Sequence, residues 1–307
     1  MYLDLNIRME GIRYMTINKC NELNFINEKI QVLIRKINEA DAIVIGGGSG
    51  ISSSAGYNHY HSEGIIKNNF IDFEKKYGFK SLFDAYYYLY SSHEERWGFF
   101  SQYIKFMNEA LPGQPYIDLY EIIKNKPHFI LTTNIDMQFS KIFKEENICL
   151  YQGEFRYFQC SQPCHDKLYE NEKIIYEMDK NLVDTKVPLE LIPRCNKCGR
   201  IMMPWVRDYE FLEGDFWKDN VRRYEEFLKK YLEGEKNVLF LELGVGDMTP
   251  SIIKLPFWKM TYNFPNSFYI SINKEKISAP EHLRERAMVI SEDIGKVLSL
   301  VRFVIEK

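Results

Sequence analysis

The chain has 307 residues, of which 45% are hydrophobic and 27% charged, so we expect a soluble globular protein that buries a full core. A formal net charge of −3 argues against nucleic acid as a partner, because binding to phosphate backbones needs a local excess of Lys and Arg. No run approaches the roughly 18 apolar residues that span a bilayer, and the first residues lack the basic and then apolar pattern of a signal peptide. We therefore expect no membrane association and a cytoplasmic location.

The first predicted elements are a helix, a strand and a glycine-rich loop. Apolar residues recur at helical spacing from about Phe25 to Ala40, which predicts an amphipathic helix. The apolar run Asp41–Ile45 is typical of a strand, and it stops at Gly46–Gly50 before a Ser/Ala-rich segment that can begin a helix. This order predicts a Rossmann-type phosphate site, in which backbone N–H groups approach a pyrophosphate closely. A glycine-rich turn without a ligand is the alternative.

Residues 57–126 are rich in aromatic side chains and predict a helical insert. Aromatic stripes such as the one around Trp97 more often pack in a core than bind a cofactor. The segment Pro112–Pro115 should break the insert into separate helices. After it, the apolar runs Phe129–Thr132 and Ile148–Leu150 predict two further strands.

Four of the six cysteines form two close pairs, a spacing that indicates metal ligands sooner than disulfides in a chain without a signal peptide. One pair is a C-x2-C turn followed by Gly199, which can take the positive φ that zinc knuckles need. The other pair is C-x3-C, and the adjacent His165 could in principle replace a thiolate. Two unrelated pairs of buried thiols are the alternative. The predicted ligands of one structural zinc ion, with no open coordination position, are Cys160, Cys164, Cys195 and Cys198.

The C-terminal part of the chain alternates between helices and strands. Charges on most faces of Phe216–Leu232 indicate a solvated helix beside a sheet. Three apolar runs predict strands at Val238–Leu243, Ser267–Ile272 and Ala287–Ile290, and a closing helix follows at Asp293–Val304. Strands that alternate with helices in this way predict a parallel, doubly wound sheet.

The predicted fold class is therefore α/β, a Rossmann-like doubly wound parallel sheet with a small zinc-ribbon domain and a helical insert. Residues 1–56, 127–150 and 208–307 should form the Rossmann-like domain, residues 57–126 the helical insert and residues 151–207 the zinc-ribbon segment. Within that segment, the charged stretch Lys167–Lys186 is expected to loop out.

Four segments, in order, resemble the signature motifs of the sirtuin family. Gly48–Gly56 is similar to the GAGxSxxSG loop, with serine for the alanine, and Thr133–Asp136 is similar to the TQNID motif, with threonine for the glutamine. Ile272–Glu275 matches the INxE motif, and the cysteine pairs lie where sirtuins carry their structural zinc. The resemblance covers about Ala40 to Leu300. It implies a sirtuin-type NAD-binding fold with NAD as co-substrate.

The resemblance also implies how NAD would be held. Backbone amides of Gly48 to Gly50, with the hydroxyls of Ser52 and Ser54, would hold the pyrophosphate. Gly244 and Gly246 would let the backbone approach the adenosine side, although the sequence GVGD departs from the family's GTSL.

At the other end of NAD, Asp136 would accept from the nicotinamide carboxamide, and Asn134 would lie beside the ribose where positive charge develops. A capped turn after a strand is the alternative for these two residues. Asn273 would bind the adenosine ribose, and the pair Asp293–Ile294 would contact the adenine. The full set of predicted NAD-binding residues is Gly48, Ser49, Gly50, Ser52, Ser54, Asn134, Ile135, Asp136, Gly244, Gly246, Asn273, Asp293 and Ile294.

Two departures from the deacylase pattern bear on the reaction. Deacylase sirtuins follow the glycine loop with a P-D-F-R type sequence, whereas this chain has Tyr57–His61, without the arginine or the aspartate. Their loss puts deacylation in doubt. His59 and His61 are either new functional groups or surface histidines of a loop.

The second departure is Gln152, in the sequence Tyr151-Gln152-Gly153, where deacylases carry a histidine that removes a proton from a ribose hydroxyl. Histidine titrates near 6.5, but a glutamine amide has no useful basicity and can only form hydrogen bonds. Cleavage of the nicotinamide bond needs no proton donor, and an Asp or Glu acceptor with a pKa near ~4 is already ionised at neutral pH. The sequence therefore predicts transfer of ADP-ribose to an acidic side chain, with Asn134, Asp136 and Gln152 in the catalytic pocket.

The combination of GGGSGISSSAGYNHY, TTNID, YQG and QCSQPC resembles the macrodomain-linked, or class M, sirtuins. That resemblance implies protein mono-ADP-ribosyltransferase activity, a lipoylated glycine-cleavage-H-like carrier protein as the target, and a macrodomain hydrolase as the reversing partner. Three alternatives stay open: an NAD-dependent lysine deacylase, an NAD glycohydrolase and a non-catalytic NAD-binding module.

Overall fold

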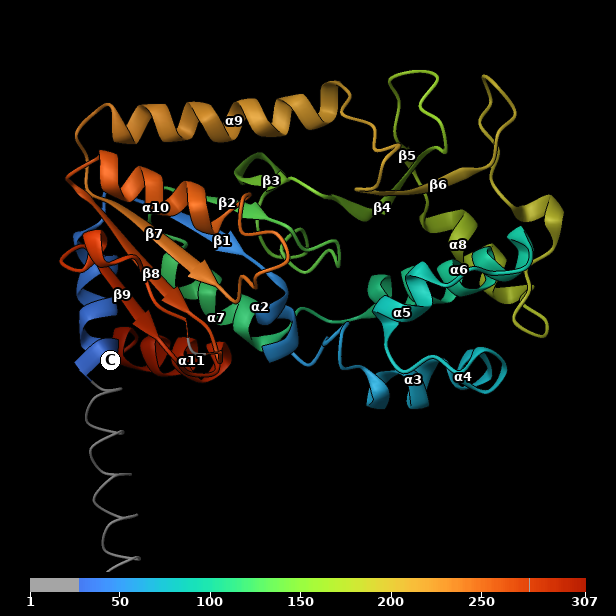
Figure 1. Ribbon diagram of the computed structural model, residues 1–307, viewed down its shortest axis with the longest axis horizontal. Coiled ribbons are helices and arrows are strands. Elements are labelled where there is room, and N and C mark those ends of the chain that lie inside the picture. The colour runs from blue at the N-terminus through green and yellow to red at the C-terminus, as the bar shows by residue number, and fades with distance from the viewer. Residues whose placement is uncertain (1–27, 276) are drawn as a thin grey trace, which may run out of the picture.

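The computed structural model describes residues 28–275 and 277–307, which form two halves, each built around its own sheet (Figure 1). The predicted helix Phe25–Ala40 is helical over residues 28–39, and its first three residues lie outside the described part. Among the helices that the structure describes, none is long and apolar enough to cross a membrane.

The larger half contains a parallel sheet of six strands in the order β3-β2-β1-β7-β8-β9. The chain runs outward from β1 to one edge and later from β7 to the other, so the strand order reverses between β1 and β7. Ligands of doubly wound sheets bind at the carboxyl ends of the strands at such a reversal. The strands are β1 (Ala42–Gly47), β2 (His128–Thr132), β3 (Ile148–Leu150), β7 (Val238–Leu243), β8 (Ser267–Ile272) and β9 (Ala287–Ile290).

The first strand is longer than the sequence predicts, because Gly46 and Gly47 continue its pairing with Glu242 and Leu243 of β7. Successive side chains of β1 point to opposite faces. Ile43 and Ile45 belong to the core under one face, and Val44 belongs to the core under the other. Both faces of the sheet are therefore buried, as a parallel sheet requires.

Helices cover both faces of the sheet. One face carries residues 28–39, α2 (Ser49–Ser54), α7 (Gln114–Ile123) and α11 (Ile294–Ile305). The other carries α9 (Asp215–Leu232) and α10 (Lys254–Asn263), both visible above the strands in Figure 1.

The smaller half has a three-stranded antiparallel sheet packed on helices, with a core of its own. Trp97, Phe99 and Phe100 are buried there, which confirms the prediction that the aromatic stripe serves packing. The strands of this half are β4 (Gly153–Cys160), β5 (Tyr169–Glu170) and β6 (Met202–Val206). Its helices are α3 (Glu63–Asn69), α4 (Ile71–Tyr77), α5 (Leu82–Tyr87), α6 (His93–Glu109) and α8 (Glu172–Lys180). Short 3-10 turns lie at Glu145–Asn147, Leu189–Leu191 and Glu281–Leu283.

The prediction that Lys167–Lys186 loops out is wrong, because this stretch contains β5 and α8. Ile175 and Met178 of α8 are fully buried in the core of the smaller half. Asp179 accepts a 2.7 Å hydrogen bond from Lys105 Nζ of α6. The charges that suggested a loop lie on the outer face of an amphipathic helix, and the few apolar residues between them fix its inner face.

The end of the helical insert, predicted at residue 126, is better placed before α7. The break at Pro112–Pro115 is confirmed, since α6 ends at Glu109 and α7 begins at Gln114. Helix α7 packs beside α11, and Tyr116 and Leu119 belong to the core of the large sheet. We therefore propose that the helical insert ends before α7 and that α7 belongs to the Rossmann-like domain.

Candidate active site and metal centre

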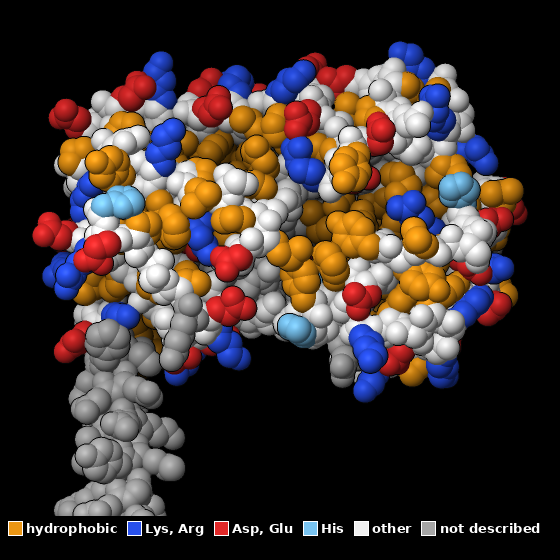
Figure 2. All heavy atoms as spheres, viewed as in Figure 1, with side chains coloured by type: hydrophobic (Ala, Val, Ile, Leu, Met, Phe, Trp, Pro, Cys, Tyr) orange, Lys and Arg blue, Asp and Glu red, His pale blue; other side chains and the backbone are white. Residues whose placement is uncertain are grey.

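A cavity of about 1000 Å³ lies between the two halves, at the carboxyl ends of the large sheet's strands. Figure 2 shows hydrophobic side chains gathered along this junction. The sheet side contributes the loops after β1, β2, β7 and β8, and the helical side contributes Asn58–His61, Phe83, Tyr86, Tyr87 and Tyr103. The predicted residues that line the cavity are Gly48, Ser49, Gly50, Ser54, Asn134, Ile135, Asp136, Gln152, Gly244, Gly246, Asn273, Asp293 and Ile294.

Ser52 is the predicted residue that does not line the cavity. It is fully buried, and its Oγ donates a 2.5 Å hydrogen bond to Asp136 Oδ2. The same hydroxyl lies 2.9 Å from Tyr116 Oη and accepts from Asn134 Nδ2 at 3.1 Å. Ser52 is thus placed to hold the side chains of the TTNID motif and not to contact a pyrophosphate directly.

The glycine loop is shaped by its contact with the loop after β7. The Gly48 N–H donates to Leu243 O and the Gly50 N–H to Gly244 O, at 3.0 and 2.9 Å. A Cβ on Gly50 would lie 2.5 Å from Gly244 Cα, and Gly244 itself has a φ of +65°. Two of the amides that the resemblance assigned to the pyrophosphate are therefore engaged in joining the two loops, where only glycine fits.

Ser54 is likewise engaged. Its Oγ donates to Asp293 Oδ1 at 2.9 Å and accepts from the Gly295 N–H at 2.8 Å. Asp293 Oδ1 also accepts from the Lys296 N–H, which caps α11. These bonds fix the start of α11 against α2 at the edge of the cavity.

Asn134 and Asp136 follow β2 and lie at the deeper end of the site. Asn134 Nδ2 donates to Gly48 O at 2.9 Å, so the amide is fixed against the glycine loop. Asp136 is 1% exposed, and its Oδ1 accepts from the Gln138 N–H at 3.2 Å. Burial by itself would raise the pKa of this carboxyl, but the nearby His59 imidazole, with the hydrogen bonds from Ser52 and Gln138, holds the pKa below its ordinary value. Asp136 is therefore a carboxylate at neutral pH.

Gln152 lies on the turn that joins β3 to β4 and is one of the residues that line the cavity. The Arg207 N–H donates to Gln152 O at 3.0 Å. Tyr151 O accepts from Arg207 Nη2 and from Trp217 Nε1, both at 3.1 Å. The turn is thus anchored on both sides of the glutamine.

Arg207 is a cavity residue that the sequence reasoning missed. Its guanidinium lies over the ring of Phe211, 4.3 Å from the centroid, and Nη1 bonds Glu213 Oε1 at 2.7 Å. It places an arginine–glutamate ion pair at the wall near Gln152. A sequence signal was present, since an arginine directly after the apolar strand end Trp205–Val206 lies at a strand terminus, where functional side chains concentrate.

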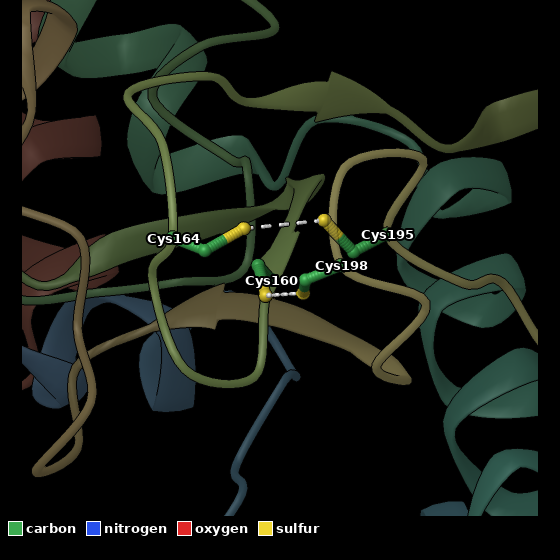
Figure 3. Close-up of side chains that lie close together, drawn as sticks. All are labelled: Cys160, Cys164, Cys195 and Cys198. Atoms are coloured by element: carbon green, nitrogen blue, oxygen red, sulfur yellow. Dashed lines mark hydrogen bonds between the residues drawn. The ribbon is translucent and has the colours of Figure 1, made fainter.

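The four predicted cysteines come together as predicted, with their sulfur atoms all within 4.8 Å of one another (Figure 3). Cys160 and Cys198 lie 3.5 Å apart, as do Cys164 and Cys195. Thiolates around tetrahedral zinc are about 3.8 Å apart, so the cluster fits a structural zinc ion with four protein ligands.

The surroundings of the cluster agree with this assignment. Gly199 has a φ of +72°, the conformation expected for the knuckle turn. His165 lies outside the set of four ligands. Its Nδ1 is 3.2 Å from Cys164 Sγ and its Nε2 is 2.7 Å from Tyr169 Oη, so it is a neighbour of the cluster.

Comparison with known proteins identifies relatives along most of the chain, although no protein-family model matches it. It is 34% identical over 277 residues to a protein ADP-ribosyltransferase of Staphylococcus aureus, covering 89% of this chain and 86% of that protein. It is 27% identical over 229 residues to a probable bifunctional ADP-ribose hydrolase/ADP-ribosyltransferase of Fusarium oxysporum f. sp. cubense, covering 72% of this chain and 38% of that protein. An NAD-dependent protein deacetylase of Clostridium acetobutylicum is 26% identical over 89% of this chain and 98% of that protein.

Solved structures share the fold. The complex of a Sir2 homolog with NAD superimposes with a TM-score of 0.60 at 15% identity, over 90% of this chain and 93% of that one. A second sirtuin structure, concerned with substrate affinity, gives a TM-score of 0.57 at 21% identity, over 86% and 94% of the two chains.

The six-stranded sheet, the cavity at its strand ends and the four-cysteine cluster are those of the sirtuin fold, which confirms the predicted fold class. With its 34% identity to the staphylococcal enzyme over most of both chains, the chain belongs to the protein ADP-ribosyltransferases of the sirtuin family. The Sir2 homolog that shares this fold was solved with NAD bound, and the four-cysteine cluster of this chain fits a structural zinc ion.

Proposed function

We propose that the enzyme transfers a single ADP-ribose from NAD to an acidic side chain of a lipoylated, glycine-cleavage-H-like carrier protein and releases nicotinamide. The observation that carries this proposal is Gln152, an amide on the cavity wall where a deacylase would carry a base. Asn134 and Asp136 line the same cavity, so the parts that cleave NAD are retained while the base is absent.

Different parts of the cavity would hold different parts of NAD. The adenosine end would lie against Gly244, Gly246, Asn273 and the Asp293–Ile294 pair, where two glycines and the start of α11 form the wall. Asn273 is already oriented for this, since its Oδ1 accepts from the Glu275 N–H and its Nδ2 donates to Val245 O. The pyrophosphate would cross the glycine loop near Ser49 and Gly50.

At the nicotinamide end, Asp136 would accept from the carboxamide and fix the leaving group. NAD supplies a pyridinium whose departure takes the electrons of the carbon–nitrogen bond with it, which leaves positive charge on the ribose. Asn134, fixed by Gly48 O, would lie beside the ribose where that charge develops, and the ionised Asp136 would add a negative charge nearby.

The class of acceptor follows from whether the attacking group must lose a proton. A carboxylate oxygen can form its bond to the ribose carbon without losing a proton, whereas a serine hydroxyl or water must give one up. Gln152 can donate a hydrogen bond to an incoming carboxylate but cannot remove a proton. Arg207 lies on the same wall, where its guanidinium is paired with Glu213.

Two further observations support the proposed carrier protein and the proposed hydrolase that removes ADP-ribose from it. Four aromatic residues, Tyr60, Phe83, Tyr86 and Tyr87, line the helical side of the cavity and would suit the aliphatic part of a lipoyl-lysine arm. Tyr87 is 58% exposed, so this wall is open to an incoming protein. The name of the Fusarium relative combines a hydrolase with a transferase, which supports a macrodomain hydrolase as the reversing partner.

The test uses labelled NAD with a carrier prepared in lipoylated and unmodified forms. We expect label on the lipoylated carrier, little on the unmodified one, and none when Asp136→Asn replaces the wild-type enzyme. Absence of label on both carriers, with an enzyme that still binds NAD, would overturn the carrier assignment. Equal labelling of both forms would retain the carrier and remove the role of the lipoyl group.

A further inference from the structure

We propose that His59 is a positioning residue of the nicotinamide pocket, where it is held by Tyr103 and keeps the Asp136 carboxylate oriented toward the leaving group. This inference rests on the role proposed above for Asp136. It gives a function to the segment Tyr57–His61, in which the chain departs from the deacylase pattern.

The first observation is that Asp136 is shielded from water. The carboxylate is 1% exposed, and among the ion pairs of the described residues its partner is His59, with 3.6 Å between Nε2 and Oδ2. That separation is too long for a hydrogen bond and short enough that a small movement of either side chain would form one. A buried carboxylate needs such a partner, because leaving water is costly for a charged group.

The second observation is that His59 is fixed from its other side. The Tyr103 hydroxyl lies 2.7 Å from His59 Nδ1, and burial raises the pKa of Tyr103 far above its ordinary value, so the phenol keeps its proton. A phenol that donates to Nδ1 leaves the neutral imidazole with its hydrogen on Nε2, the atom that faces Asp136.

The third observation is that His59 Nε2 is buried and has no hydrogen-bond partner in the described part of the molecule. A buried donor without a partner is costly, and Asp136 is the acceptor that faces it. The loop itself is fixed, because Asn58 Oδ1 accepts from the backbone N–H groups of Tyr60 and His61, at 3.1 and 2.8 Å. His59 is therefore directed at Asp136 by a built turn and not by a free loop.

The carboxylate then has a donor on each side. Ser52 and His59 face Oδ2, and the Gln138 N–H bonds Oδ1. Together these donors fix the rotation of the carboxylate, and they leave one position on Oδ1 for the carboxamide of nicotinamide. Without His59, the carboxylate would lose the imidazole that faces Oδ2, at the end of the site that distinguishes NAD from ADP-ribose.

The test compares two variants of His59 in binding experiments that need no protein acceptor. His59→Phe keeps a ring of similar size against Tyr103 but has no donor, whereas His59→Gln keeps an N–H that can reach Asp136. Calorimetry measures the affinity of each variant for NAD and for ADP-ribose, and a competition experiment measures the affinity for nicotinamide. His93→Phe, a change of the same kind at an exposed position of α6, is the matched control.

We expect His59→Phe to weaken binding of NAD and of nicotinamide by about 10- to 100-fold, the effect of losing one hydrogen bond to a charged group. Affinity for ADP-ribose should change by less than about twofold, because His59 acts at the nicotinamide end alone. His59→Gln should recover most of the loss, and His93→Phe should resemble the wild type. Tyr103→Phe should shift NAD binding in the same direction as His59→Phe, by a smaller factor.

Two results would overturn the inference. Wild-type discrimination between NAD and ADP-ribose in His59→Phe would show that the imidazole nitrogen is not needed. Equal losses for both ligands in both His59 variants would show that the residue only packs the loop. If Asp136→Asn also leaves this discrimination unchanged, the role proposed for Asp136 fails as well, whereas a failure to label the carrier leaves the binding result intact.

Discussion

Gln152 lies on a turn that Arg207 and Trp217 hold in place, and it lines the same cavity as Asn134 and Asp136. An amide in this position can orient a ribose hydroxyl or an incoming carboxylate, but it cannot accept a proton at neutral pH. Under the proposed function, this one residue would limit the acceptors to groups that are already ionised.

The substitution Gln152→His tests whether the glutamine positions the acceptor or merely leaves out a base. We expect transfer to fall by roughly tenfold, the effect of one altered hydrogen bond, without any gain of deacylation. Deacylation should not appear because the loop Tyr57–His61 also lacks the arginine and aspartate of deacylases. The measurements are transfer to the carrier and turnover of an acetyl-lysine peptide, with Gln31→His at an exposed helix position as control. Turnover of the peptide would mean that the glutamine only vacates the role of the base.

At this scale the sequence predicted which residues gather but not how they are bonded. Twelve of the thirteen predicted NAD-binding residues line the cavity, and Ser52 lies behind its wall. Ser54 and the amides of Gly48 and Gly50 bond to Asp293, Leu243 and Gly244, which are distant in sequence. A sequence motif predicts that a residue lies near the cavity. The hydrogen-bond partners of that residue depend on how segments distant in sequence pack together.

Among the elements, the three-stranded sheet is the one whose strand ends carry the four-cysteine cluster. Cys160 ends β4, and Cys195 and Cys198 lie on the turn that precedes β6. Four thiolates this close repel one another unless a cation lies between them. Zinc should therefore hold the ends of this sheet together.

Loss of the metal should destabilise the smaller half. We expect Cys195→Ser to abolish zinc binding and to lower the unfolding midpoint by on the order of 10 °C, because binding of a structural zinc contributes directly to folding free energy. Cys149→Ser, a buried cysteine of β3 outside the cluster, is the control and should retain the metal. Zinc content and thermal unfolding are the measurements. A full complement of zinc in Cys195→Ser would contradict the assignment of the site.

Glu242 makes β7 sensitive to pH. Its carboxyl is fully buried and accepts hydrogen bonds from Tyr269 Oη at 2.8 Å and Ser271 Oγ at 3.2 Å. Burial raises its pKa from 4.5 to about 6, against the opposing effect of these bonds and of Lys254. The folded state thus binds this proton more tightly than the unfolded state. Its contribution to stability is complete below about pH 4.5 and is lost as the pH rises through about 6.

The substitution Glu242→Gln removes the cost of ionising this buried group. It should raise the free energy of unfolding by about 2 kcal/mol at pH 8 and by much less at pH 5. Urea unfolding at the two pH values measures the difference, and Glu225→Gln at an exposed position of α9 controls for the change in net charge. An equal effect of Glu242→Gln at both pH values would show that the carboxyl is not titrating.

The strands of the large sheet were predictable because parallel strands buried on both faces are continuous apolar runs. Helix α8 was not, because its inner face consists of a few apolar residues among many charges. The packing of α7 against α11 could not be predicted from the sequence either, because the contact joins segments far apart in the chain. Local pattern predicts an element well when its own residues determine burial, and poorly when a distant element does.

At the scale of the whole molecule, the cavity lies between two halves that contribute different kinds of residue. The sheet half provides the loops that face NAD, and the helical half provides His59, Tyr103 and the aromatic wall. An acceptor protein must therefore present its side chain at the junction visible in Figure 2. Its chemistry is constrained there by Gln152 and Arg207 on one side and the nicotinamide pocket on the other.

The most direct test of this account is the chemistry of the bond between ADP-ribose and the labelled carrier. Neutral hydroxylamine attacks the carbonyl of an ester, so it releases ADP-ribose from an Asp or Glu side chain and leaves an O-glycosidic bond to a serine intact. We predict that hydroxylamine removes nearly all of the label and that peptide mapping by mass spectrometry locates the site at an acidic residue. Label that resists hydroxylamine and maps to a hydroxyl side chain would contradict transfer without a resident base.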